Sequence, residues 1–164
     1  MLPHFDAAHN LARWILSGRG EAEDLTQESV LRAFQHFEGY RGGDPRSWLL
    51  RIVRNTCYNW LEKNKAAKES APFDEELHGS FPLTPEMIVI DEENRARLTA
   101  ALEDLPVRLR EIFVLREMEG YSYKEIAAIT SVPIGTVMSC LSRARKFLLL
   151  RVTDAKVRGL GNAP

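Results

Sequence analysis

Cysteine is scarce and long hydrophobic runs are missing in this chain of 164 residues. Its two cysteines, Cys57 and Cys140, lie far apart and have no histidine or cysteine neighbour at the spacing of metal ligands. We therefore expect neither a disulfide framework nor a zinc site, and a reducing, cytoplasmic location is the simplest one. No run of about 18 apolar residues is present, so we expect no membrane insertion. The first twenty residues lack a clean apolar segment and a cleavage site, so we expect no secretion signal.

Patterns of catalysis and of cofactor binding are missing as well. The sequence has no glycine-rich phosphate loop, and its four histidines have no partners at a meaningful spacing. We expect no catalytic residue, no metal, no cofactor and no small-molecule substrate, which means a protein that acts by binding.

Charge is distributed in blocks, although the net charge is only −1. With Lys and Arg counted against Asp and Glu, residues 41–68 and residues 106–164 each carry +5, whereas residues 1–40 carry −3 and residues 69–105 carry −8. A protein that contacts a polyanion at two places needs two such basic blocks. The alternative is that solvated helix faces simply vary in charge.

Apolar residues recur at helical spacing in most of the chain, and no alternation typical of strands competes with this pattern. Three helices are predicted in the first 63 residues. One carries Leu11 and Trp14, one begins near Asp24, and one begins near Pro45, a residue that is tolerated in a first turn.

The second of these helices is predicted to have a capping box, with Asp24 as its cap and Gln27 three residues later. Its inward face is expected to consist of Leu25, Val30 or Leu31, Phe34 and Phe37. On the third helix we expect Trp48, Leu49 and Trp60 in the core, with base stacking by Trp48 as the lesser alternative.

Prolines, glycines and fading periodicity then divide the chain. We predict an all-α protein with two small helical domains, residues 1–63 and 86–152, joined by a flexible linker at 64–85. Residues 153–164 are expected to form a frayed tail.

Residues 121–148 have the pattern of a helix-turn-helix. Ser122 can cap a helix with Glu125 at its third position, a turn follows at residues 131–133, and a second helix begins near 134 and ends near 150. The inward face of the second helix is expected to carry Val137, Leu141, Ala144 and Leu148.

The second helix of such a motif lies in the major groove of DNA. Hydroxyl and basic side chains on its exposed face can contact phosphates and base edges. The candidate DNA-binding residues are Thr136, Ser139, Ser142, Arg143 and Lys146. The alternative is an ordinary helical hairpin with basic residues in its last turn.

Two segments together resemble the extracytoplasmic-function (ECF) group of the sigma-70 family of RNA polymerase sigma factors. Residues 22–34, 40–43 and 47–55 are similar to sigma domain two, with the sequences AEDLTQE leading into LRAF, YRGG and SWLLRIVRN. Residues 121–127 and 133–145 are similar to sigma domain four, with the sequences YSYKEIA and PIGTVMS ending in RAR. The resemblance implies an alternative sigma factor that binds core RNA polymerase and directs promoter-specific transcription initiation.

In that family, the Asp-x-x-Gln-Glu face binds a coiled coil of the largest polymerase subunit. The resemblance therefore implies that Asp24, Gln27 and Glu28 contact core polymerase. Domain two of the family also melts the minus-ten element, and domain four reads the minus-thirty-five element. An anti-sigma factor that clamps the two domains is expected as a partner by resemblance only.

Capture of a melted strand needs a basic track together with aromatic or amide groups for an unstacked base. The candidates implied in domain two are Arg41, Arg46, Arg51, Arg54, Asn55, Tyr58 and Asn59. In domain four, Met138 and Cys140 stand where many relatives have arginine, which implies an altered base preference or weaker binding. Cys140 itself is interpreted as a small residue near a helix surface.

Two other classes of protein remain open from the residues alone. A repressor or activator with an N-terminal dimerisation or ligand domain explains residues 105–150 equally well, and a helical scaffold that binds only protein would make both basic patches incidental. The acidic linker predicts a further property: neutralising Asp74, Glu75 and Glu76 should raise the affinity of the free protein for DNA.

Overall fold

The computed structural model describes residues 4–17, 20–65 and 92–161, and all their regular elements are helical, which confirms the all-α prediction. The elements are α1 (Phe5–Ile15), α2 (Ala22–Gln35), the 3₁₀ turn η2 (Phe37–Gly39), α3 (Pro45–Lys63), α4 (Glu92–Asp104), α5 (Val107–Phe113), the π-helical turn η5 (Val114–Met118), α6 (Tyr123–Thr130) and α7 (Ile134–Gly161). Most of the predicted linker lies outside the described residues.

The first three helices pack against one another as one group. On α1 the inward face consists of Ala7, Ala8, Leu11, Ala12 and Ile15. α3 begins as predicted, with Pro45 in its first turn and Asp44 as its cap. The Asp44 carboxylate accepts hydrogen bonds from the backbone N–H groups of Arg46 and Ser47 at 3.2 Å each, which fixes the start of the helix. Leu49 is buried on α3, whereas Trp48 and Trp60 are only half-buried.

The prediction for α2 was wrong in two respects. The helix begins at Ala22 with Glu21 as a cap that makes no side-chain hydrogen bond, so Asp24 lies inside the first turn. Of the predicted inward residues, Leu25 is buried, and Val30 packs against the core, whereas Leu31, the alternative to Val30, is 62% exposed. Phe34 and Phe37, which were also expected to face inward, are 61% and 57% exposed.

The inward face of α2 consists of the predicted Leu25 together with four small side chains, those of Ala22, Thr26, Ser29 and Ala33. The hydroxyls of Thr26 and Ser29 donate to backbone carbonyls four residues earlier, each at 2.6 Å. Because these hydroxyls are bonded within their own helix, they can be buried without an unpaired polar atom.

The C-terminal half contains the predicted helix-turn-helix. The Ser122 side chain accepts from the Glu125 N–H at 3.1 Å, and the Glu125 carboxylate accepts from the Ser122 N–H at 3.3 Å, which confirms the capping box. Ser131 ends α6 in the left-handed conformation at φ 57°, and α7 leaves at 101° to α6. The four predicted inward residues of α7 are all buried. Cys140 is only 4% exposed, so its predicted place near the surface was wrong.

α7 is longer than predicted, because it continues as helix to Gly161 and includes most of the tail that was expected to be frayed. No single helix among the described residues is long and apolar enough to cross a membrane. Within the part of the chain that the structure describes, α6 taken together with residues 134–153 passes that test, as a sharply bent pair.

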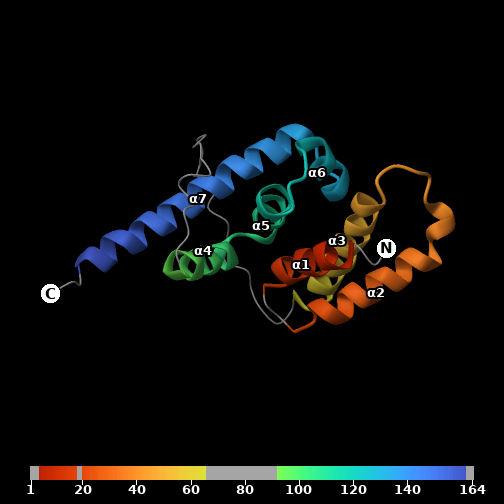
Figure 1. The fold of residues 1–164 in the computed structure, drawn as a ribbon, viewed down its shortest axis with the longest axis horizontal. Helices are drawn as coiled ribbons and strands as arrows, with labels where there is room; N and C mark the ends of the chain where they lie inside the picture. Colours follow the sequence, from red (N-terminus) through yellow and green to blue (C-terminus); the bar gives the residue numbers. More distant parts are fainter. Residues whose placement is uncertain (1–3, 18–19, 66–91, 162–164) are drawn as a thin grey trace.

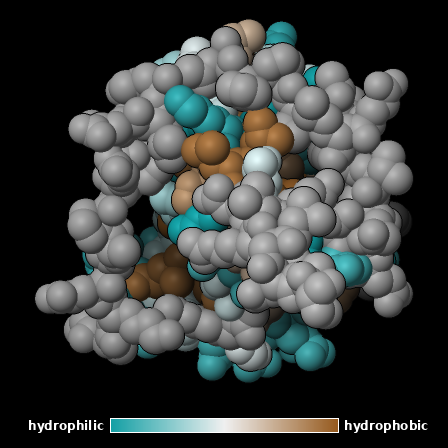
Figure 2. Space-filling model, turned by 90° about the vertical axis from the view of Figure 1, so that its left-hand side faces the viewer, coloured by the Kyte–Doolittle hydropathy of each residue, from teal (hydrophilic) through white to brown (hydrophobic). Residues whose placement is uncertain are grey.

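The two halves of the chain pack directly against each other. Figure 1 shows α1, α2 and α3 at one end, α5 and α6 beside them, and α7 extending to the other end over α4. α1 contacts α5 and η5, and α3 contacts α6. Seen from the end toward which α7 extends, both hydrophobic and hydrophilic side chains of the described residues are visible (Figure 2).

Candidate nucleic-acid and protein interfaces

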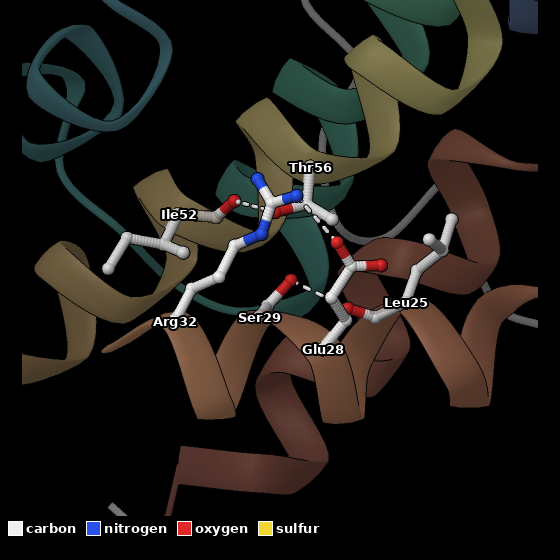
Figure 3. Close-up of polar contacts among 6 residues, drawn as sticks. All are labelled: Leu25, Glu28, Ser29, Arg32, Ile52 and Thr56. Atoms are coloured by element: carbon white, nitrogen blue, oxygen red, sulfur yellow. Dashed lines mark hydrogen bonds and ion pairs between the residues drawn. The ribbon is translucent and has the colours of Figure 1, made fainter. Parts of the chain in front are cut away.

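The outer face of α2 combines polar and apolar side chains. Asp24, Gln27, Leu31 and Phe34 are all exposed and follow one another at steps of three and four, so they share one stripe of the helix. Glu28, beside this stripe, forms an ion pair with Arg32 at 2.6 Å (Figure 3).

The sequence interpretation missed the two apolar residues of this stripe. A signal for them exists, because Ala22, Ser29 and Ala33 already define an inward face of small residues. That face leaves Leu31 and Phe34 on the opposite side of the helix.

A cavity of about 350 Å³ lies between α2 and α3. Its lining consists of Arg32, His36, Gly39, Trp48, Ile52, Asn55 and Thr56. Three of these residues can be followed in Figure 3, where Arg32 comes from α2 and Ile52 and Thr56 from α3. Of the predicted site residues, only Asn55 belongs to this cavity.

Aromatic rings flank the cavity on the side of Trp48. Its ring centroid is 5.2 Å from that of Tyr40 and 6.4 Å from that of Phe37. After Tyr40, the chain turns through Gly42 and Gly43 at φ 86° and 97°, a conformation that favours glycine. The turn brings the Tyr40 hydroxyl to the Gly43 carbonyl, to which it donates a hydrogen bond.

Four of the predicted DNA-binding residues in the N-terminal half are exposed. Arg51, Asn55 and Asn59 lie at steps of four on α3, and Arg41 lies in the loop before it. Arg51, Asn55 and Asn59 give α3 an outward face of one guanidinium and two amides.

The other three predicted residues point toward the C-terminal helices. Arg54 donates from Nε to both carboxylate oxygens of Glu111, at 3.1 and 3.0 Å, and its guanidinium lies 4.3 Å from the centre of the Tyr58 ring. Arg46 donates to Glu119 at 2.9 Å and lies 4.7 Å from the centre of the Tyr121 ring. The sequence interpretation did not anticipate either pairing.

Burial changes the acid–base properties around Glu111, whose side chain is completely inaccessible to solvent. Desolvation raises the pKa of Glu111 to about 7, although the neighbouring Arg54 acts to lower it. Desolvation also raises the pKa of Tyr58, with Glu111 adding to the effect. The same two causes raise the pKa of Cys57 to about 12, so this thiol stays protonated at neutral pH.

The outward face of α7 holds the predicted DNA-binding residues of the C-terminal half. Ser139 is exposed, and Thr136, Ser142, Arg143 and Lys146 are half-buried. Two apolar residues accompany them, Ile134 at 44% and Met138 at 51% exposure. Arg145 is turned to Glu117 of η5, with which it pairs at 2.8 Å. Within residues 4–17, 20–65 and 92–161, no group of three or more His, Cys, Asp or Glu is placed to hold a metal ion.

Two family models match the chain. Sigma-70 region 2 matches residues 3–67, and Sigma-70 region 4 matches residues 95–148. Among curated proteins, the chain is 36% identical over 146 residues to the ECF RNA polymerase sigma factor SigE of Mycolicibacterium smegmatis, covering 88% of this chain but only 57% of that relative. It is 35% identical over 159 residues to the ECF RNA polymerase sigma-E factor of Salmonella typhimurium, covering 92% of this chain and 80% of that one.

Solved structures of similar shape include two proteins in complexes. The sigma factor RpoE in complex with the anti-sigma factor NepR from Bartonella quintana matches with a TM-score of 0.71 and 27% identity over 93% of both chains. CnrH in complex with the cytosolic domain of CnrY matches with a TM-score of 0.66 and 22% identity, over 94% of this chain and 84% of that one, and supports the fold alone. Because both sigma regions match in order and a relative is aligned over four fifths of its length, the chain belongs to the ECF group of sigma-70 RNA polymerase sigma factors.

Proposed function

We propose that this chain performs the family's role, promoter-specific transcription initiation, through three separate surfaces. The outer stripe of α2 binds core RNA polymerase, the cavity and exposed face of α3 hold the melted minus-ten strand, and the outward face of α7 reads the minus-thirty-five duplex. The protein acts by binding and not by catalysis, and because polymerase and DNA are its partners, we place it in the cytoplasm.

The observation that carries this proposal is the stripe of Asp24, Gln27, Leu31 and Phe34 on α2. Two large apolar side chains beside an amide and a carboxylate are costly to leave in water, and such a combination is typical of a protein-binding surface. The stripe also contains two of the three residues that the family resemblance assigns to the polymerase contact.

The α2–α3 cavity supports the assignment to an unpaired base. Its volume of about 350 Å³ is at the lower end of the range of small-ligand pockets and suits a single nucleobase. Trp48 can provide a stacking surface and Asn55 an amide that pairs with a base edge, while Arg51 lies one helical turn before Asn55 for a phosphate.

An anti-sigma factor is a further partner that we propose. The solved sigma factor RpoE, which is 27% identical to this chain, was determined in complex with the anti-sigma factor NepR. The exposed stripe of α2 offers such a partner the same surface that polymerase would use.

Transcription from a randomised promoter library tests the function as a whole. The chain is added to core polymerase that lacks any sigma factor, and the transcribed templates are sequenced. We expect two short sequence elements to be enriched, separated by the distance between a minus-thirty-five and a minus-ten element. A repressor would instead bind duplex DNA without core polymerase, and a scaffold would enrich no sequence, so either result would reject the proposal.

A further inference from the structure

The first two turns of α7 present an apolar surface to solvent. Ile134 is 44% exposed, and Met138, one turn later, is 51% exposed. Because side chains four residues apart lie on the same face of a helix, the two form one apolar patch. Neither residue belongs to the hydrophobic core of the described chain or packs against it. The patch is therefore not needed for the packing of the helix-turn-helix.

Hydrogen-bond donors are scarce beside this apolar patch. Residues 131–142 contain no charged side chain, and the first cation of α7 is Arg143. The hydroxyl of Ser139 donates to the backbone carbonyl of Thr136 in its own helix, at 3.1 Å. The start of α7 therefore offers a ligand mainly apolar surface, and the charged donors follow further along the helix.

Gly135 lies beside the apolar patch and adds no side chain to it. Apart from the adjoining backbone, a Cβ at this position would meet no atom within 4 Å, and the backbone is not left-handed. Neither packing nor backbone conformation therefore requires a glycine here, although glycine is less favourable in a helix than alanine. A position without a side chain lets the helix backbone come close to a ligand.

Charge along α7 indicates what kind of partner meets this surface. Residues 134–153 contain four arginines or lysines and no aspartate or glutamate. Arg145 and Arg151 pair with carboxylates of the C-terminal half, whereas Arg143 and Lys146 continue the outward face that begins with the apolar patch. A cationic surface of this kind favours a polyanion, so we assign the patch to duplex DNA and not to a second protein.

The major groove of DNA contains one apolar group that such a patch can recognise. All base pairs present hydrogen-bonding atoms there, but an A·T pair also presents the C5-methyl group of thymine, which apolar side chains contact. In a helix-turn-helix, the residues near the start of the second helix reach the base edges, and Ile134 and Met138 lie at that place. The unbranched side chain of Met138 can adapt its shape to the methyl group.

We propose that Ile134 and Met138 determine promoter specificity by contacting thymine C5-methyl groups in the minus-thirty-five duplex. Gly135 allows the close approach that this contact needs, and Arg143 and Lys146 continue the contact with the duplex further along α7. The inference rests on the proposed function, because it assumes that the outward face of α7 lies in the major groove of that duplex. It adds which chemical feature of the bases the start of the helix recognises.

The test removes single methyl groups from the DNA. The full chain bound to core polymerase first selects duplexes from a promoter library that is randomised in the upstream element. Each thymine of the enriched element is then replaced by uracil, which lacks the methyl group but keeps the same hydrogen-bonding atoms. Uracil in the flanking duplex is the control on the side of the DNA.

The affinity of the polymerase complex for each duplex is measured with the parent chain and with two variants. One variant combines Ile134→Ala with Met138→Ala. The matched control is Leu150→Ala, which shortens an apolar side chain that is 47% exposed on the same helix but lies far from its start. Circular dichroism and a cooperative unfolding transition establish that both variants are folded, as we expect for substitutions of exposed side chains.

We expect uracil at one or more positions of the element to lower the affinity of the parent by about fourfold for each methyl group removed, the effect of burying one such group. The Leu150→Ala control should show the same loss. The double variant should bind the thymine and uracil duplexes equally well, because it lacks the side chains that contact the methyl group.

The inference and the proposed function fail in different ways. If no upstream element is enriched, the assignment of α7 to the minus-thirty-five duplex is overturned, and the inference with it. If an element is enriched but contains no A·T pair, or if uracil leaves the affinity of the parent unchanged, α7 reads the duplex without the apolar patch. An equal loss in the parent and in the double variant would also overturn the inference alone.

Discussion

Glu111 has an environment that few carboxylates have, since it is fully buried and faces charged and titratable groups from three helices. Arg54, Tyr58 and Cys57 approach it from α3, Arg108 from its own helix and Cys140 from α7. Desolvation dominates over these neighbours and raises the pKa of Glu111 to about 7. Between pH 4.5 and 7 the folded chain therefore holds a proton on Glu111 that the unfolded chain releases.

This difference predicts that the free energy of unfolding falls as the pH rises through that window. Between pH 5 and 7 the contribution of Glu111 amounts to roughly 2 kcal/mol. Urea unfolding at pH 5 and at pH 7 should show that the parent loses this part of its free energy of unfolding, whereas Glu111→Gln does not. Equal pH dependence in the two proteins would contradict the prediction, because the two proteins differ only at Glu111.

A second residue on which the proposed function depends is Arg143 of α7. Arg143→Ala is expected to lower the affinity for the preferred minus-thirty-five duplex by about 1–3 kcal/mol, if its guanidinium forms two hydrogen bonds with a guanine. Arg151→Ala is the matched control, because Arg151 lies on the same helix, is exposed and pairs with Asp104. Equal effects of the two substitutions in a fluorescence anisotropy titration would exclude a special role of Arg143.

Among the helices, α2 shows best how an inward face can be misassigned. Large apolar residues usually mark the buried side of a helix, and this expectation placed Phe34 inward. In the structure, small residues with internally bonded hydroxyls are buried, which lets α2 pack against α3 and leaves Phe34 exposed. The capping box of α6 was predictable because it depends only on residues three positions apart.

The outer face of α2 leads to a prediction for the whole element. Leu31→Ala combined with Phe34→Ala should weaken binding to core polymerase by tenfold or more, roughly 1.4 kcal/mol, because buried apolar anchors dominate such interfaces. The fold should be retained, since both side chains are more than half exposed. Gln35→Ala on the same helix is the control. Binding to core polymerase that survives the double substitution would place the docking surface elsewhere.

At the scale of the whole molecule, we expect the ion pairs of Arg46 and Arg54 with Glu119 and Glu111 to limit how many cations the free protein offers to DNA. We therefore expect the salt dependence of binding to single-stranded DNA to steepen when these two ion pairs are broken. Each arginine that newly contacts a phosphate adds about 0.7 to the slope of log affinity against log salt, so freeing two adds roughly 1.4. The measurement compares the parent with the double variant Glu111→Gln/Glu119→Gln. Equal slopes in the two proteins would show that neither Arg46 nor Arg54 reaches the strand.

Much of this protein could be predicted from local sequence. Helical periodicity, the Pro45 start of α3, the helix-turn-helix and the inward face of α7 all depend on residues within a few turns of one another. The sigma-factor family followed from two local motifs in order. Exposure of Asp24, Gln27, Arg51 and Asn59 was predictable for the same reason, whereas their contacts with polymerase and DNA remain predictions.

Tertiary structure alone decided which of the candidate residues are accessible. Arg54 and Glu111 are 57 positions apart, and Arg46 and Glu119 are 73 positions apart, so no spacing rule connects them. Arg51 and Arg54 lie three residues apart on one helix, yet Arg51 faces solvent and Arg54 faces a buried carboxylate. The sequence by itself determined the helices and their motifs, because these depend on neighbours along the chain. The packing of one half against the other determined what each basic residue contacts, because burial and ion pairing depend on distance in space.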